Sequence, residues 1–152
     1  TPAAAARSAV VLENLENFYH LDKMSALLRR WQPENDFTAA DWLFGAGNQI
    51  SNALNRAYLV QYGAMYCLFD WDIGGLQIFR NLQTMLPQTA VRFVLPPEPA
   101  EYLMKSNRLL NTQQRSKLAD LGGMSPETDC LIAAMRRTGR SLEQEIYLIE
   151  EP

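Results

Sequence analysis

The run Ala64–Phe69 is the feature that most constrains the fold, because it is an almost unbroken apolar stretch that ends at the acid Asp70. It has the length of a strand, and its lack of polar alternation is typical of a strand buried on both faces of a parallel sheet. Such a strand needs helices over both faces, since parallel strands are joined by helical crossovers. We therefore predict an α/β fold built around residues 64–69.

Three further short apolar runs predict the other strands of this sheet, over residues 9–12, 41–44 and 91–95. Between the runs, apolar residues recur at helical spacing after Glu13, after Gly47 and after Gly75. The resulting order βαβαβαβ predicts a Rossmann-like, four-stranded parallel sheet that is flanked by helices and joined by right-handed crossovers.

The pattern becomes helical from Glu98 onward, and Gly139 is a typical helix stop. The residues that we expect to cap helices in this part are Thr112, Ser125 and Ser141. We predict one domain over residues 1–152, with a core of residues 9–97 and a helical extension of residues 98–152. Thr1 is not an initiator Met, so we expect the chain to be the C-terminal part of a longer protein.

The composition is that of a globular chain, with 47% hydrophobic and 20% charged residues. No apolar run approaches the roughly 18 residues of a membrane helix, so we expect no membrane partner and a cytoplasmic location. Cys67 lies in an apolar run and Cys130 in a helical pattern, and two such cysteines make neither a disulfide framework nor a zinc site. A reducing compartment suits them.

The net charge of −3 means that any nucleic-acid contact must be a local basic patch. Residues 105–140 hold seven basic and three acidic residues and are the segment with a net positive balance. We predict that Arg136, Arg137 and Arg140 carry such a contact. The alternative is that this segment presents ordinary solvated helix faces.

Three acids follow predicted strands at the point where each strand ends, namely Glu13, Asp70 and Asp72. Ligands of parallel α/β sheets bind beyond the carboxyl ends of the strands, so we expect these carboxylates to converge there. Clustered carboxylates repel one another unless a cation compensates them, and oxygen ligands suit Mg²⁺ or Mn²⁺. The alternative is that the aspartates only end a strand and cap a helix.

The segment from Asp70 to Gly75 has the pattern D-x-D-x-x-G after an apolar strand, and Val10–Phe18 carries Glu13 after an earlier strand. Together these motifs resemble the Toprim domain over roughly residues 9–95. The likeness is strongest to the A subunit of topoisomerase VI and to the nuclease subunit of Wadjet plasmid-defence systems. Residues 142–145, Leu-Glu-Gln-Glu, also resemble the end of that Wadjet subunit.

The resemblance implies that Asp70 and Asp72 hold Mg²⁺ against a scissile phosphate and that Glu13 acts as a further ligand or as general acid and base. Topoisomerase VI cleaves with a tyrosine on a separate winged-helix domain, for which this chain has no room. The expected reaction is therefore Mg²⁺-dependent hydrolysis of nucleic acid, with DNA as the expected substrate, in plasmid or phage defence. The expected partners are other domains of a longer protein, a defence complex or a second copy in a homodimer. The alternative is a Toprim-like module that binds nucleic acid or a protein partner without cutting it.

Glycines at two strand-to-helix junctions are candidates for phosphate or substrate binding. These candidates are Gly45, Gly47 and Asn48 at the first junction, and Gly74 and Gly75 at the second. Free backbone N–H groups at a helix start can hold a phosphate, whereas the alternative is a tight turn that needs small residues. Glu143 and Glu145 either supply a ligand for a second metal ion or belong to a solvated helix end.

Overall fold

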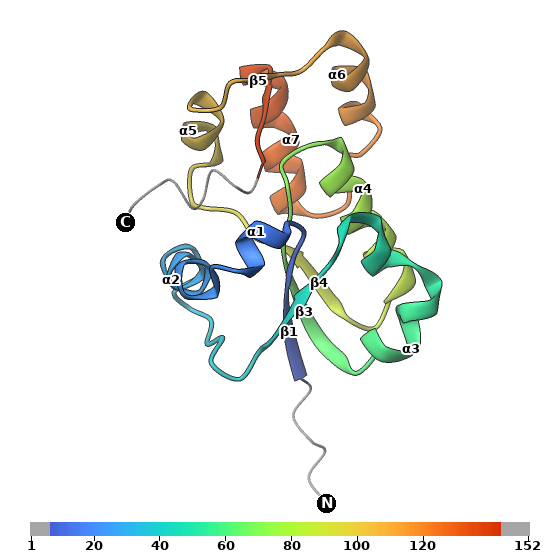
Figure 1. The fold of residues 1–152 in the computed structure, drawn as a ribbon. Helices are drawn as coiled ribbons and strands as arrows, with labels where there is room; N and C mark the ends of the chain where they lie inside the picture. Colours follow the sequence, from blue (N-terminus) through green and yellow to red (C-terminus); the bar gives the residue numbers. More distant parts are fainter. Residues whose placement is uncertain (1–6, 144–152) are drawn as a thin grey trace, which may run out of the picture.

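Four parallel strands form one sheet in the computed structural model, which describes residues 7–143 (Figure 1). The strands are β1 (Arg7–Leu12), β2 (Asp41–Phe44), β3 (Tyr62–Leu68) and β4 (Ala90–Phe93). Their order across the sheet is β2-β1-β3-β4, and every pairing is parallel. The predicted α/β fold with a four-stranded parallel sheet is confirmed.

The chain changes direction across the sheet between β1 and β3. From β1 it crosses to β2 on one side, and from β2 it returns to β3 on the other side. Leu12 lies beside both Phe44 and Leu68, so β1, β2 and β3 end almost level with one another. In open α/β sheets this reversal point is where ligands bind, because the loops leaving the two central strands diverge there.

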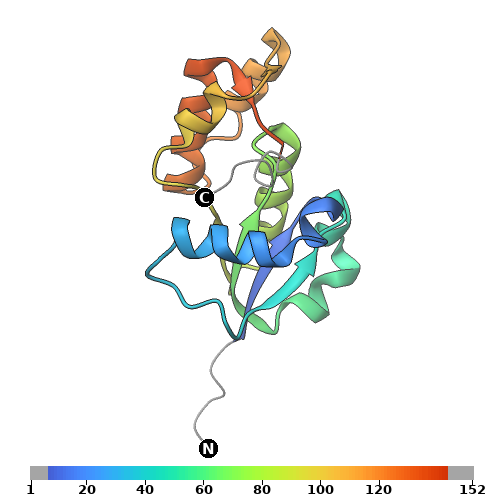
Figure 2. The ribbon, with the colours of Figure 1, turned by 60° about the vertical axis from the view of Figure 1, so that its left-hand side comes forward.

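Helices cover both faces of the sheet, with α2 on one face and α3 and α4 on the other (Figures 1 and 2). The helical segments of this part are α1 (Leu15–Phe18), α2 (Leu21–Trp31), η1 (Gly47–Ser51), η2 (Ala53–Asn55), α3 (Arg56–Leu59) and α4 (Ile73–Met85). The prediction of a single helix after Gly47 is wrong, because two 3₁₀ segments and one turn of α-helix occupy these residues. The cause is Asn52, which is extended and accepts a hydrogen bond from Leu54 N–H, as short polar side chains do in competition with helix.

The C-terminal part is helical, as predicted, and lies beyond the carboxyl ends of the strands (Figure 1). Its elements are α5 (Pro99–Met104), β5 (Arg108–Leu109), α6 (Thr112–Ala119), α7 (Pro126–Thr138) and β6 (Arg140–Ser141). Ser125 caps α7 as expected, whereas Asn111 rather than Thr112 caps α6. Ser141 belongs to β6, which pairs antiparallel with β5, and not to a helix start. Glu145 lies outside the described residues.

The buried side chains form one core that joins the sheet to the C-terminal helices. Trp71 is fully buried and joins the two parts, because its ring lies 6.4 Å from that of Trp31 on α2 and 6.0 Å from that of Tyr102 on α5.

Cys67 is buried and Cys130 is exposed, and both are free thiols. In residues 7–143, no helix has the length and apolar character needed to cross a bilayer.

Candidate active site

Glu13 and Asp70 meet at the carboxyl end of the two central strands. Glu13 directly follows β1, and Asp70 follows β3 by two residues. The backbone N–H of Asp70 donates a hydrogen bond of 2.8 Å to Glu13 Oε2. Because β1 and β3 flank the reversal point of the sheet, the structure brings this pair of acids to the place where such folds bind ligands.

Asp72 lies two residues further on and caps α4. Its Oδ1 accepts a hydrogen bond of 2.8 Å from Gly75 N–H, which satisfies one of the free donors at the helix start. A carboxylate has two oxygens, so this cap leaves Asp72 a second oxygen. Asp72 therefore has a structural role as the N-cap of α4.

Trp71 lies between the two aspartates, and its backbone is hydrogen-bonded to the C-terminal segment. Its backbone N–H donates to the carbonyl oxygen of Leu142 over 2.8 Å, and its own carbonyl accepts from Leu142 N–H over 3.0 Å. With its buried ring held by Trp31 and Tyr102, this residue fixes the backbone on which both aspartates are carried. The link joins residues 71 positions apart in the sequence, and no local pattern predicts it.

The Leu142 pairing also brings a fourth acid, Glu143, toward the site. The pKa of Glu13 is raised from 4.5 to about 7, mainly by burial and then by the negative charge of Asp70. The hydrogen bond from Asp70 N–H opposes this rise, while the charges of Asp72 and Glu143 add to it. Glu143 is itself paired with Arg108. Four carboxylates therefore share one electrostatic environment, in which burial and the neighbouring negative charges disfavour the ionised form of Glu13.

The donors present fit Mg²⁺ in kind, because every one is a carboxylate oxygen. Within residues 7–143, no three His, Cys, Asp or Glu side chains are arranged as ligands of a single ion. Mg²⁺ does not need three, since it commonly binds one or two carboxylates and keeps its remaining waters. Asp70 with either Asp72 or Glu13 offers carboxylates of this kind, and a cation there would offset the repulsion that raises the Glu13 pKa.

The glycine junction between β2 and η1 is accounted for by its backbone geometry. Gly45 N–H donates to Leu12 O over 2.7 Å, and Ala46 and Gly47 have φ angles of 49° and 61°, in the left-handed region. The segment that follows is a five-residue 3₁₀ helix and not the α-helix expected. Asn48 lies in that helix. These features agree with a tight turn, and phosphate binding at Gly45, Gly47 and Asn48 stays a prediction.

The second glycine pair opens α4. Gly74 is exposed, whereas a Cβ on Gly75 would overlap the carbonyl oxygen of Asp70. Gly75 therefore lets the helix pack directly on the aspartate loop, which is a structural reason for glycine at this position.

The three arginines expected to contact nucleic acid differ in their surroundings. Arg136 and Arg137 are exposed in the last turn of α7. Arg140 instead donates hydrogen bonds to the carbonyl oxygens of Met104 and Ser106, over 3.0 Å and 2.6 Å. Its guanidinium ties β6 to the end of α5, so the structure gives Arg140 a role within the fold.

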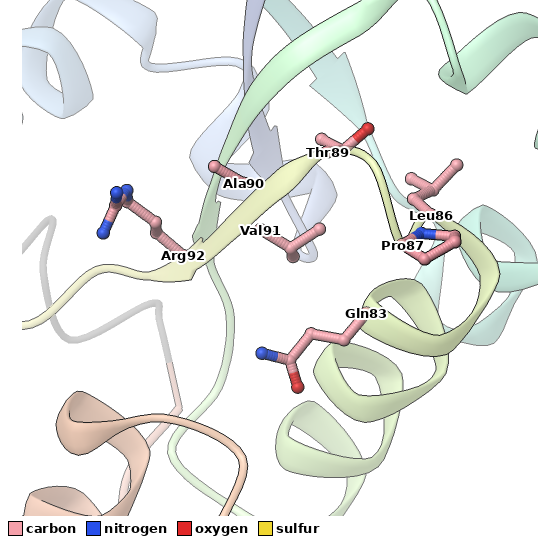
Figure 3. Close-up of a pocket in the computed structure, with 7 residues that line it drawn as sticks. All are labelled: Gln83, Leu86, Pro87, Thr89, Ala90, Val91 and Arg92. Carbon is pink, nitrogen blue, oxygen red and sulfur yellow. The ribbon is translucent and has the colours of Figure 1, made fainter.

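A pocket of about 340 Å³ lies between β4 and the end of α4 (Figure 3). Its lining residues are Gln83, Leu86, Pro87, Thr89, Ala90, Val91 and Arg92. The side chain of Arg92 points away from that of Gln83 in this view, and none of the lining residues carries a group that titrates near neutral pH. The pocket borders the start of β4, at the other end of the sheet from the acids.

Comparisons of the chain with models of protein families, with curated proteins and with solved structures found no match. The functional argument consequently depends on the geometry of the acids.

Proposed function

We propose that this chain is a Toprim-type domain that cleaves phosphodiester bonds of nucleic acid, with DNA as its substrate and Mg²⁺ or Mn²⁺ as its cofactor. The observation that carries the proposal is the meeting of Glu13 and Asp70 at the reversal point of the sheet, with the Glu13 pKa near 7. Perturbed acids in a ligand-binding position are typical of catalytic sites.

In this proposal the three acids have different roles, which follow from their surroundings. Asp70 and Asp72 would hold the metal, and Mg²⁺, when bound, supplies positive charge to the phosphate and lowers the pKa of a bound water. Glu13 is placed to exchange a proton, since an acid with a pKa near 7 is suited to general acid–base catalysis at neutral pH. Trp71 keeps the two aspartates in register with Glu13 through its backbone pairing with Leu142.

The proposal also covers the cellular location and the partners of the chain. We place the chain in the cytoplasm, as part of a plasmid or phage defence system with further domains or a second copy as partners. Both cysteines are free, which agrees with a reducing compartment.

A second function is a module that binds without cutting. The observation that favours it is the use of acids in the fold itself, since Glu13 accepts from Asp70 N–H and Asp72 from Gly75 N–H. Both bonds would persist in a site that never binds a metal.

A plasmid-nicking assay separates the two functions. The chain is incubated with supercoiled DNA in Mg²⁺, in Mn²⁺ and in EDTA, beside Asp70→Asn and the control Asp120→Asn, an exposed acid at the end of α6. We expect cutting that requires metal and is lost in Asp70→Asn but kept in the control. Cutting in EDTA, or at the parental rate in Asp70→Asn, would contradict the nuclease proposal. DNA binding without cutting by the parent chain would favour the binding module.

A further inference from the structure

We propose that Arg108 is the phosphate-contacting residue of this site, held by Glu143 until a divalent cation occupies the carboxylates. The proposal rests on the proposed function, and it concerns a residue whose sequence context gives no sign of such a role. Its ligand is the phosphodiester group of a nucleic-acid backbone.

The fold places Arg108 beside the aspartate loop through a short series of backbone pairings. Arg108 lies opposite Ser141 in the β5–β6 pair, and Leu142, the next residue, pairs with Trp71. Ser106 secures the arrangement, because its hydroxyl donates to the carbonyl of Ser141 and accepts from Arg108 N–H. Trp71 is flanked by both aspartates, so Arg108 is tied to the loop that carries them.

The charges give the reason for a cation at this point. Glu13, Asp70, Asp72 and Glu143 together repel a phosphodiester, which is an anion. Arg108 is the cation that pairs with Glu143, one acid of this group. An arginine suits the role, because its planar fork can donate two hydrogen bonds to phosphate oxygens.

The Arg108–Glu143 ion pair is weak enough to be broken when another charge binds nearby. The side chains are 54% and 43% exposed, so solvent screens the pair and it contributes little to stability. A cation bound by the carboxylates would compete with Arg108 for Glu143 and release the guanidinium toward the substrate. Arg108 should therefore oppose metal binding and favour nucleic-acid binding.

The test measures these two affinities separately in Arg108→Gln, with Arg80→Gln on the exposed face of α4 as the matched control. Mg²⁺ binding is measured by calorimetry without nucleic acid. Binding of a DNA duplex is measured as a function of salt concentration, in EDTA and in Ca²⁺. We expect Arg108→Gln to bind Mg²⁺ about threefold to tenfold more tightly, because a competing positive charge has been removed. In Ca²⁺ we expect it to bind DNA more weakly, with a log–log salt slope lower by about 0.9. In EDTA we expect little difference from the parent, because Glu143 then holds Arg108.

Arg108→Lys separates charge from geometry, since it should restore the parental Mg²⁺ affinity but only part of the DNA affinity. Equal Mg²⁺ and DNA affinities in Arg108→Gln and Arg80→Gln would overturn the proposal, as would a loss of both affinities together. A parent chain that binds no Mg²⁺ would contradict the proposed function. A parent chain that binds Mg²⁺, but whose salt slope in Ca²⁺ is unchanged by Arg108→Gln, would overturn the present proposal alone.

Discussion

Replacing Glu13 by Gln should stabilise the fold above pH 7 and change it little below pH 4.5. The folded state holds the Glu13 proton up to about pH 7, whereas the unfolded chain releases it near 4.5. Below pH 4.5, protonated Glu13 therefore makes its full contribution to the free energy of unfolding of the parent chain. That contribution is lost as the pH rises from 4.5 to about 7, and no further loss occurs above pH 7. Glutamine keeps an oxygen that accepts from Asp70 N–H but carries no charge to be buried.

The size of the effect follows from the rise in pKa. At about 1.4 kcal/mol for each pKa unit between 4.5 and about 7, ionised Glu13 is disfavoured by about 3 kcal/mol in the folded chain. The side chain is only half-buried, and screening by solvent reduces the expected gain to about 2 kcal/mol.

Urea unfolding at pH 4.5 and pH 8, followed by tryptophan fluorescence, measures this gain. With an m-value of about 2 kcal/mol/M, the midpoint of Glu13→Gln should lie about 1 M above that of the parent at pH 8 and close to it at pH 4.5. Millimolar Mg²⁺ should narrow the gap at pH 8, because it stabilises the parent by mass action and relieves the same repulsion.

The control is Glu34→Gln, which alters an exposed acid in the loop after α2 and should leave the midpoint unchanged at both pH values. If the gain from Glu13→Gln is the same at pH 4.5 as at pH 8, or is absent at both, then Glu13 is not a desolvated acid beside other acids. The reasoning from its pKa would be refuted.

Three further predictions concern the glycines and arginines around the site. Gly75→Ala should lower the free energy of unfolding by about 3 kcal/mol in urea titrations because its Cβ would overlap backbone, whereas Gly74→Ala should be near neutral. Arg140→Ala should lose about 1 kcal/mol by the same measurement because the carbonyls of Met104 and Ser106 lose their donor, and an equal loss in Arg137→Ala would contradict that role. If Arg136 and Arg137 each contact a phosphate, replacing both by Ala should lower the log–log salt slope of DNA binding by about 1.8, and an unchanged slope would place the contact elsewhere.

The sheet could be predicted from the sequence because its signals are local. The apolar run before Asp70 and the run over residues 41–44 each correspond to a strand. Parallel topology then required Glu13 and Asp70 to end at the same edge of the sheet, and this inference needed no knowledge of side-chain contacts. The helix after Gly47 was predicted wrongly. The spacing of apolar residues does not show that the Asn52 side chain accepts a hydrogen bond from Leu54 N–H, which interrupts the helix.

The contribution of the C-terminal part to the site could not be predicted. It depends on the two-residue strands β5 and β6 and on the single bridge between Trp71 and Leu142, which are too short to have a periodic signal. Arg108 was missed for this reason. Its neighbours in sequence give no indication that the chain returns to the aspartate loop.

The most direct test of the account is a titration of the chain with Mn²⁺ followed by electron paramagnetic resonance, which counts bound ions without requiring DNA or cleavage. We predict that the parent chain binds Mn²⁺, that Mg²⁺ displaces it, and that Glu13→Gln and Asp70→Asn each weaken binding by about tenfold or more, because each removes a carboxylate charge from the ion. Binding of equal strength in the parent and in both variants, or no binding by the parent, would contradict the claim that the acids between β1 and β3 form a divalent-metal site.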